Sequence, residues 1–155
     1  MNRLLSVYLD ANCIGAWHRN KEIEELKQLN NEGKIIIEPS DLLSEEFRKN
    51  KGYPRGEKEL SKFIISFSNT WDKDDRRRFT EVLQILFGKK EIDCSENQKC
   101  DACHINQAIR EGIDYFVTND KEILEKATEI KKRFCLTICK PESALKHVKQ
   151  ILKIN

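Results

Sequence analysis

Short apolar runs alternate with amphipathic stretches along most of this chain. Residues 4–9 and 34–38 are apolar with little polar alternation, which is typical of strands covered on both faces in a parallel sheet. Two further strands are predicted at residues 114–117 and 134–138. Apolar positions at helical spacing predict the intervening helices, among them residues 17–29, 39–48 and 141–152. This order of elements predicts a three-layer α/β/α domain with a central, mostly parallel sheet.

The middle of the chain carries its clearest helical pattern. Apolar residues recur at helical spacing in two consecutive stretches, at Leu60, Phe63, Ile64, Phe67 and Trp71 and then at Phe79, Val82, Leu83 and Leu86. We expect both stripes to face a core. A chain of 155 residues is expected to form one domain. These stretches are therefore predicted as a helical insertion at about 57–90 in a single domain that spans 1–155.

Capping signals mark the start of two later helices. Ser95 and Gln98 fit a capping box, which predicts a helix from about residue 96 with Asp101 in its second turn. Gly112 is expected to end this helix. Asn119 and Glu122 resemble a second capping box, which would place Asp120 in the first turn of the following helix.

Acidic residues stand where the predicted strands end. Asp10 directly follows the first strand and Asp120 follows the strand at 114–117, while Glu45 and Glu46 lie on the helix after the second strand. Functional crevices of open α/β sheets lie at the carboxyl ends of the strands. Carboxylates gathered there repel one another unless a cation is present, and hard divalent cations prefer oxygen ligands. The pattern therefore indicates a metal site, with simple helix caps at Asp10 and Asp120 as the alternative.

Composition adds little to this picture. The formal net charge is +2, which neither indicates nor excludes a nucleic-acid-binding protein. A basic turn follows Glu46 and contains Arg48, Lys49, Lys51 and Arg55. No signal peptide is visible and no run approaches the roughly 20 apolar residues of a membrane span, so we expect a cytoplasmic protein without membrane contact.

One cysteine motif offers a competing interpretation. Cys100, Cys103 and His104 match the C-x-x-C-H pattern of haem attachment, and Cys94 would extend them to a zinc set. The motif is predicted to lie within a helix, no second C-x-x-C pair exists, and no axial haem ligand is evident. A small Cys/His zinc-binding protein therefore remains only an alternative.

The chain resembles the PIN domain, a nuclease fold found in VapC-type toxins and in RNA-processing factors. The matching segments are Val7 to Asn12, Ser40 to Phe47, Asp101 with Ala108 and Gly112, and Phe116 to Asp120. They span residues 4 to about 125, and the middle helices carry no family motif. Ala11 departs from the family pattern, which commonly has Thr or Ser there.

The resemblance implies a site and an activity. It implies that four carboxylates bind Mg²⁺ or Mn²⁺, namely Asp10, Glu46, Asp101 and Asp120, with Glu46 preferred over Glu45 because Phe47 follows it. Asn12 and Thr118 would orient these carboxylates. The implied activity is an endoribonuclease that cleaves RNA phosphodiester bonds with a water activated by the metal ion.

The place of the basic turn in the chain suggests how RNA would be bound. Because this turn follows the predicted helix that carries Glu46, we expect Arg48, Lys49, Lys51 and Arg55 to contact the RNA backbone. The family also suggests a small antitoxin protein as a partner and a homodimer. The alternative outside enzymes is a PIN-like module that binds RNA or protein without cutting.

Overall fold

The computed structural model describes residues 3–10, 13, 20–38 and 68–155. Within them, four strands form one sheet: β1 (Leu5–Leu9), β2 (Ile35–Glu38), β3 (Tyr115–Val117) and β4 (Thr137–Cys139). Their order is β2-β1-β3-β4, and each neighbouring pair is parallel. The predicted parallel sheet is confirmed. All four carboxyl ends therefore lie at the same edge.

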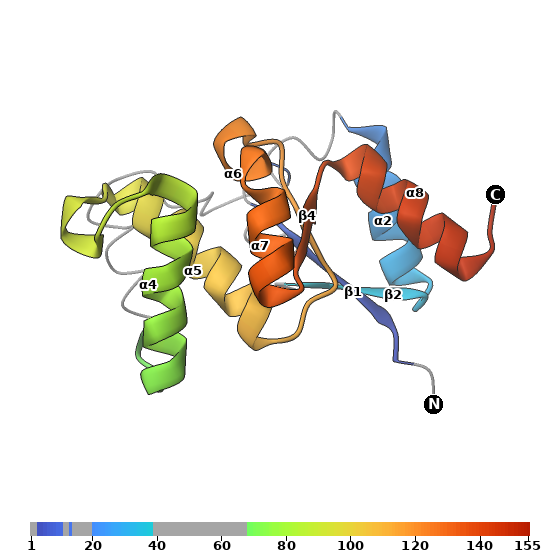
Figure 1. Ribbon diagram of the computed structural model, residues 1–155. Coiled ribbons are helices and arrows are strands. Elements are labelled where there is room, and N and C mark those ends of the chain that lie inside the picture. The colour runs from blue at the N-terminus through green and yellow to red at the C-terminus, as the bar shows by residue number, and fades with distance from the viewer. Residues whose placement is uncertain (1–2, 11–12, 14–19, 39–67) are drawn as a thin grey trace, which may run out of the picture.

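Helices cover both faces of this sheet and make three layers (Figure 1). One layer is α2 (Lys21–Asn31) and α8 (Pro141–Leu152). The other contains α4 (Lys73–Phe87), α5 (Glu96–Arg110), α6 (Lys121–Glu125) and α7 (Ala127–Phe134), and a short 3₁₀ turn, η4 (Glu91–Asp93), precedes α5. This arrangement confirms the predicted α/β/α fold. None of the helices in the described segments is long and apolar enough to cross a membrane.

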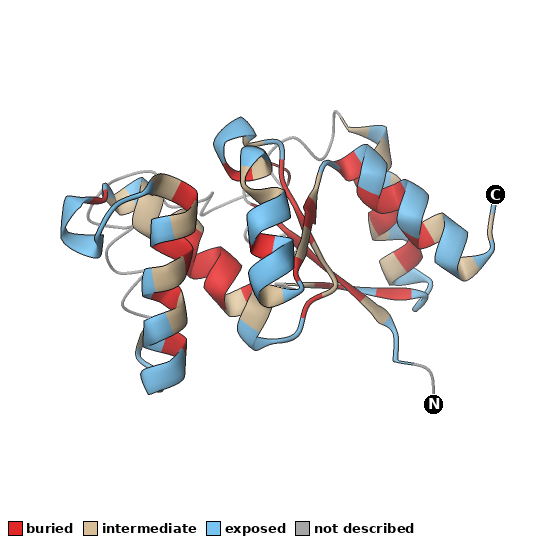
Figure 2. Ribbon diagram, in the orientation of Figure 1, coloured by how far each residue is buried: buried red, intermediate tan, exposed pale blue. Residues whose placement is uncertain are grey.

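The core is divided between the two faces because side chains alternate along each strand. Tyr8 and Phe116 lie side by side in the register and belong to the hydrophobic cluster with α4, α5 and α7. Leu9 and Val117 form the next row and pack in the other cluster, with α2 and α8. Figure 2 shows the buried positions along the strands and on the helix sides that face them.

The predicted start and end of α5 agree with the structure. The Ser95 side chain accepts a hydrogen bond from the Gln98 backbone, and the Gln98 side chain accepts one from the Ser95 backbone. Gly112 follows the helix with a φ of 66°, a left-handed conformation that glycine adopts without a Cβ penalty. Helix α5 directly precedes β3 in the chain and carries Asp101 in its second turn.

Several predicted boundaries were wrong. The last strand spans Thr137–Cys139 instead of 134–138. The reason is that α7 continues to Phe134, and Cys135 caps its end in a left-handed conformation with a φ of 62°. The single helix expected after Asn119 is two helices, α6 and α7. Helix α2 extends two residues beyond 29. The helix predicted at 39–48 and the insertion before residue 68 lie outside the described residues.

Candidate functional site

The carboxyl ends of β1 and β3 meet at the centre of the sheet edge. The chain leaves β1 toward β2 on one side and returns to β3 on the other, so the strand order reverses between β1 and β3. The Asp10 backbone N–H donates to the Val117 carbonyl at 2.9 Å, which joins the two strand ends. Such a switch point is where open α/β sheets form their binding crevices. Asp10 and Asp120 both follow the strands that border it.

Asp10 is held in place by a buried hydroxyl. Asp10 is only 6% exposed, and the Thr118 hydroxyl donates to its Oδ2 at 2.7 Å. The same hydroxyl oxygen accepts the Asp120 backbone N–H at 3.0 Å. Thr118 therefore links the backbone of one candidate acid to the carboxylate of the other.

Asp120 serves as the N-cap of α6. Its Oδ1 accepts the backbone N–H groups of Glu122 at 2.9 Å and Ile123 at 3.3 Å. The expected capping box was therefore wrong by one residue, since Asn119 was predicted as the cap. Asn119 is exposed, and its side-chain amide approaches the Cys13 sulfur at 3.6 Å. Capping uses one oxygen of Asp120 and does not prevent its carboxylate from adding charge to the sheet edge.

Asp101 differs from the other two acids because no polar partner for it is found among the described residues. It is half-buried on α5, and within the described segments nothing donates a hydrogen bond to its carboxylate or forms an ion pair with it. Burial first, and then the charges of Asp10, Asp120 and Glu122, raise the pKa of Asp101 from 3.8 to about 8. The structure thus brings three of the predicted acids into electrostatic contact, and Asp101 holds a proton at neutral pH.

Glu122 is a neighbour of this site that the sequence analysis did not identify as a site residue. It lies in the first turn of α6, two residues after Asp120, and its charge contributes to the raised pKa of Asp101. Its position in the first helical turn after a strand was the available signal, but that signal was interpreted only as part of a capping box. Glu122 adds a further carboxylate at the sheet edge.

The remaining predicted site residues are not seen. Glu46 and its alternative Glu45, the orienting residue Asn12, and the basic residues Arg48, Lys49, Lys51 and Arg55 all lie outside the described residues. Within the described part of the chain, no three acidic, histidine or cysteine side chains form a ready-made metal group. The described candidate ligands at the edge nonetheless offer carboxylate oxygens, and the Asp101 carboxylate would gain a counter-charge from a hard divalent cation.

The cysteine motif does not form a comparable centre. Cys94, Cys100, Cys103 and His104 are all described and buried, and no three of them come together as a metal group. The Cys94 thiol donates to the Lys90 carbonyl at 3.3 Å. Nδ1 of His104 is engaged by Tyr8, and burial lowers the pKa of His104 to about 4. These side chains are core residues of α5 and its approach.

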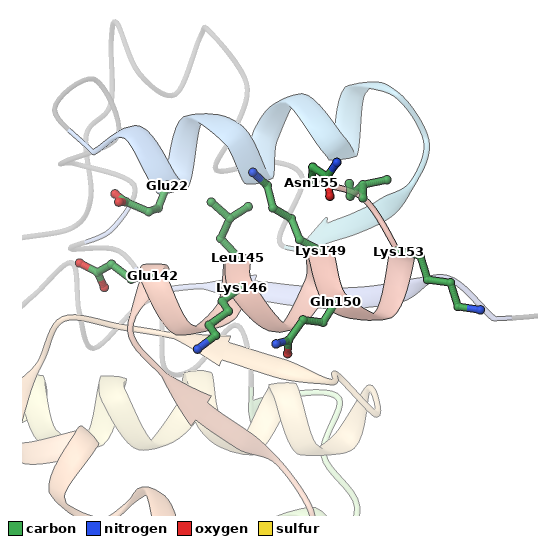
Figure 3. A pocket seen from close by; sticks show the side chains of 9 residues that line it. Glu22, Glu142, Leu145, Lys146, Lys149, Gln150, Lys153 and Asn155 are labelled. Carbon is green, nitrogen blue, oxygen red and sulfur yellow. The ribbon is translucent and has the colours of Figure 1, made fainter.

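A groove elsewhere on the surface is another place that could hold a ligand. It runs along α8 on the α2 side of the sheet, with the carboxylates of Glu22 and Glu142 at one end and Lys153 at the other (Figure 3). Between them, Lys149 pairs with Glu25 at 2.8 Å. Its lining mixes charges of both signs and contains none of the candidate acids. The sheet edge is therefore the stronger candidate site.

Comparisons with protein-family models, with curated proteins and with solved structures found no significant match to this chain. The interpretation of the sheet edge is therefore argued from the residues of this chain and their geometry.

Proposed function

We propose that this chain is a metal-dependent endoribonuclease whose site lies at the carboxyl edge of the sheet. Asp10, Asp101 and Asp120, with Glu46 from the preceding part of the chain, would hold Mg²⁺ or Mn²⁺. When bound, such a cation lowers the pKa of a water molecule and stabilises the charge that develops on a phosphodiester.

The carboxyl of Asp101, which has no polar partner among the described residues and lies near Asp10 and Asp120, is the observation that carries this proposal. A half-buried carboxylate beside two others is unfavourable for the metal-free fold, because burial and like charges both penalise its ionised form. Proteins keep such strained groups mainly at functional sites. A divalent cation removes the penalty by supplying the missing counter-charge. If these acids served only to cap helices, Asp120 would be sufficient and a half-buried acid at position 101 within α5 would have no purpose.

The choice of RNA as substrate is supported by the PIN-like motifs around the same acids. Phosphates cannot approach several carboxylates unless the metal and nearby cations offset the repulsion. Arg48, Lys49, Lys51 and Arg55 are the cations proposed to guide the RNA backbone, since they follow Glu46 in the chain. The small antitoxin and the homodimer stay predictions.

The direct test is cleavage of a single-stranded RNA by the purified chain with Mg²⁺, with Mn²⁺ and with EDTA. The parent is expected to cut only with a divalent cation. Asp101→Asn is expected to lose nearly all activity, because it removes ligand charge without changing shape. Asp74→Asn is the matched control, since Asp74 is exposed on α4 and pairs with the exposed Arg77. Full activity in Asp101→Asn, or cleavage by the parent in EDTA, would refute the proposal.

Two further comparisons assign the residues outside the described segments. Glu45→Gln and Glu46→Gln, assayed side by side, show which glutamate is the ligand, and loss of activity is expected for Glu46→Gln. Replacing the four basic turn residues with Ala, with Ca²⁺ in place of Mg²⁺ to block turnover, should weaken RNA binding and flatten its salt dependence. An unchanged affinity and salt slope would mean that these four cations only face solvent.

A further inference from the structure

A buried tyrosine–histidine pair lies beneath the candidate site. The Tyr8 hydroxyl and Nδ1 of His104 share a hydrogen bond between β1 and α5, across a separation of 96 residues in sequence. Both side chains are 1% exposed. The Tyr8 ring stacks on Phe116 at 5.4 Å between centroids and meets the His104 ring edge-on at 5.6 Å. Packing on two sides therefore restrains the ring that makes this bond.

Both members of the pair are uncharged at neutral pH. Burial lowers the pKa of His104 to about 4. Burial first, and then the charges of Glu111 and Asp10, raise the pKa of Tyr8 well above its ordinary value. The bond is thus a neutral contact in an apolar layer, and its strength does not change over the pH range in which Asp101 titrates.

The pair connects the two elements that carry the buried acids. Asp10 follows Tyr8 by two residues, directly past the end of β1, and its charge contributes to the raised pKa of Tyr8. Asp101 precedes His104 by three residues, and in a helix this spacing also returns a side chain to the same face. Each candidate ligand therefore lies within three residues of one member of the hydrogen-bonded pair. Any slide of α5 along β1 that changed the separation of Asp10 and Asp101 would have to break the Tyr8–His104 bond.

We propose that Tyr8 and His104 are positioning residues that set the separation between Asp10 and Asp101 for a shared divalent cation. This inference depends on the proposed metal site but concerns a contact that does not touch the metal. Partners behind metal ligands typically change metal affinity by about 10–100-fold when they are removed. An effect near the lower end of that range is expected here, because the bond acts through the spacing of two elements.

The chain offers a matched control in a second tyrosine–histidine pair. Tyr115 on β3 and His147 on α8 have ring centroids 6.1 Å apart, on the opposite face of the sheet. Removing the Tyr115 hydroxyl changes the same chemical group without affecting the connection between β1 and α5. Tyr115→Phe is therefore expected to bind metal as the parent does.

The test measures Mn²⁺ binding by calorimetry, without RNA, for proteins whose folding is verified by circular dichroism. Tyr8→Phe is expected to bind Mn²⁺ about tenfold more weakly than the parent. It is also expected to lose stability, because it leaves Nδ1 of His104 buried without its partner. The double variant Tyr8→Phe/His104→Leu removes both members of this bond, so it should regain the part of the stability that Tyr8→Phe loses through the unsatisfied Nδ1, while its Mn²⁺ affinity stays low.

The outcomes separate the two proposals. If the parent binds no Mn²⁺, the metal site and the positioning role both fall. If the parent binds Mn²⁺ and Tyr8→Phe binds it equally well, only the positioning role is overturned. Recovery of both stability and Mn²⁺ affinity in the double variant would also overturn it, since that result would show a contribution to folding alone.

Discussion

Replacing Asp101 with Asn should stabilise the metal-free protein at neutral pH. The pKa of Asp101 is raised from 3.8 to about 8, first by burial and then by the charges of Asp10, Asp120 and Glu122. Unfolding exposes the carboxyl to water and returns its pKa to the ordinary value. Between these two pKa values the folded state holds a proton that the unfolded state releases. The free energy of unfolding therefore falls as the pH rises through this window.

The size of the effect follows from the width of that window. Each pH unit within it removes about 1.4 kcal/mol from the free energy of unfolding, so at pH 7 the total is about 4 kcal/mol. This figure is an upper bound, because Asp101 is only half-buried and its proton is shared in part with the neighbouring acids. Asn has nearly the same shape as a protonated Asp and carries no charge. The variant should match the parent near pH 4 and exceed it by up to about 4 kcal/mol at pH 7.

The assay is urea unfolding in EDTA at closely spaced pH values from 4 to 8.5, for the parent and for Asp101→Asn. The difference between the two should grow with pH and level off above pH 8. Asp74→Asn should show no such growth, since Asp74 is exposed. A difference that is constant with pH, or a variant less stable than the parent at pH 7, would refute the reasoning. Adding Mg²⁺ should then stabilise the parent more than Asp101→Asn, because a ligand stabilises only the state that binds it.

Two other substitutions test contacts that support the site and the helix layer beside it. Thr118→Val keeps the shape of a fully buried residue but leaves the Asp10 carboxylate without the hydroxyl that donates at 2.7 Å, so urea unfolding at pH 7 should show a loss of about 1–3 kcal/mol. An unchanged midpoint would mean that this bond contributes nothing to stability. Asp75→Asn removes the charge from a carboxylate that is 4% exposed and pairs with Arg78 at 2.5 Å and Arg110 at 3.2 Å, so we expect a loss of about 3–5 kcal/mol. A loss below about 1 kcal/mol, as for an exposed ion pair, would contradict the prediction that this buried ion-pair network stabilises the fold.

Local sequence signals predicted many of the elements. The helix from residue 96 with its Ser95–Gln98 capping box and the helix at 141–152 are found as expected, because both depend on residues within a few positions. The apolar run at 34–38 also predicted a strand of a parallel sheet, and β2 is that strand, but the expected cover on both faces was wrong because Ile36 is 41% exposed. In each case the hydrogen-bond partner or the apolar period lies within the segment itself.

The misses occurred where local signals were ambiguous. Two polar residues that both cap helices well, Asn119 and Asp120, stand next to each other, and only the course of the chain after β3 selects Asp120. Phe134 is apolar and suits a strand, yet it packs beside the core as the last residue of α7. Neither choice is encoded in the residue types alone.

The sequence by itself determined which groups are available and roughly where: acids directly after two strands, an acid in the second turn of a helix, and alternating elements that require a parallel sheet. The tertiary structure decided that β1 and β3 are neighbours at the switch point, which brings Asp10, Asp101 and Asp120 within electrostatic reach of one another. It also decided that Asp101 lacks a partner among the described residues while Thr118 serves Asp10, and that Tyr8 meets His104 across 96 residues. The physical reason is that burial and Coulomb interactions depend on distances in space, and those distances exist only once the sheet has formed.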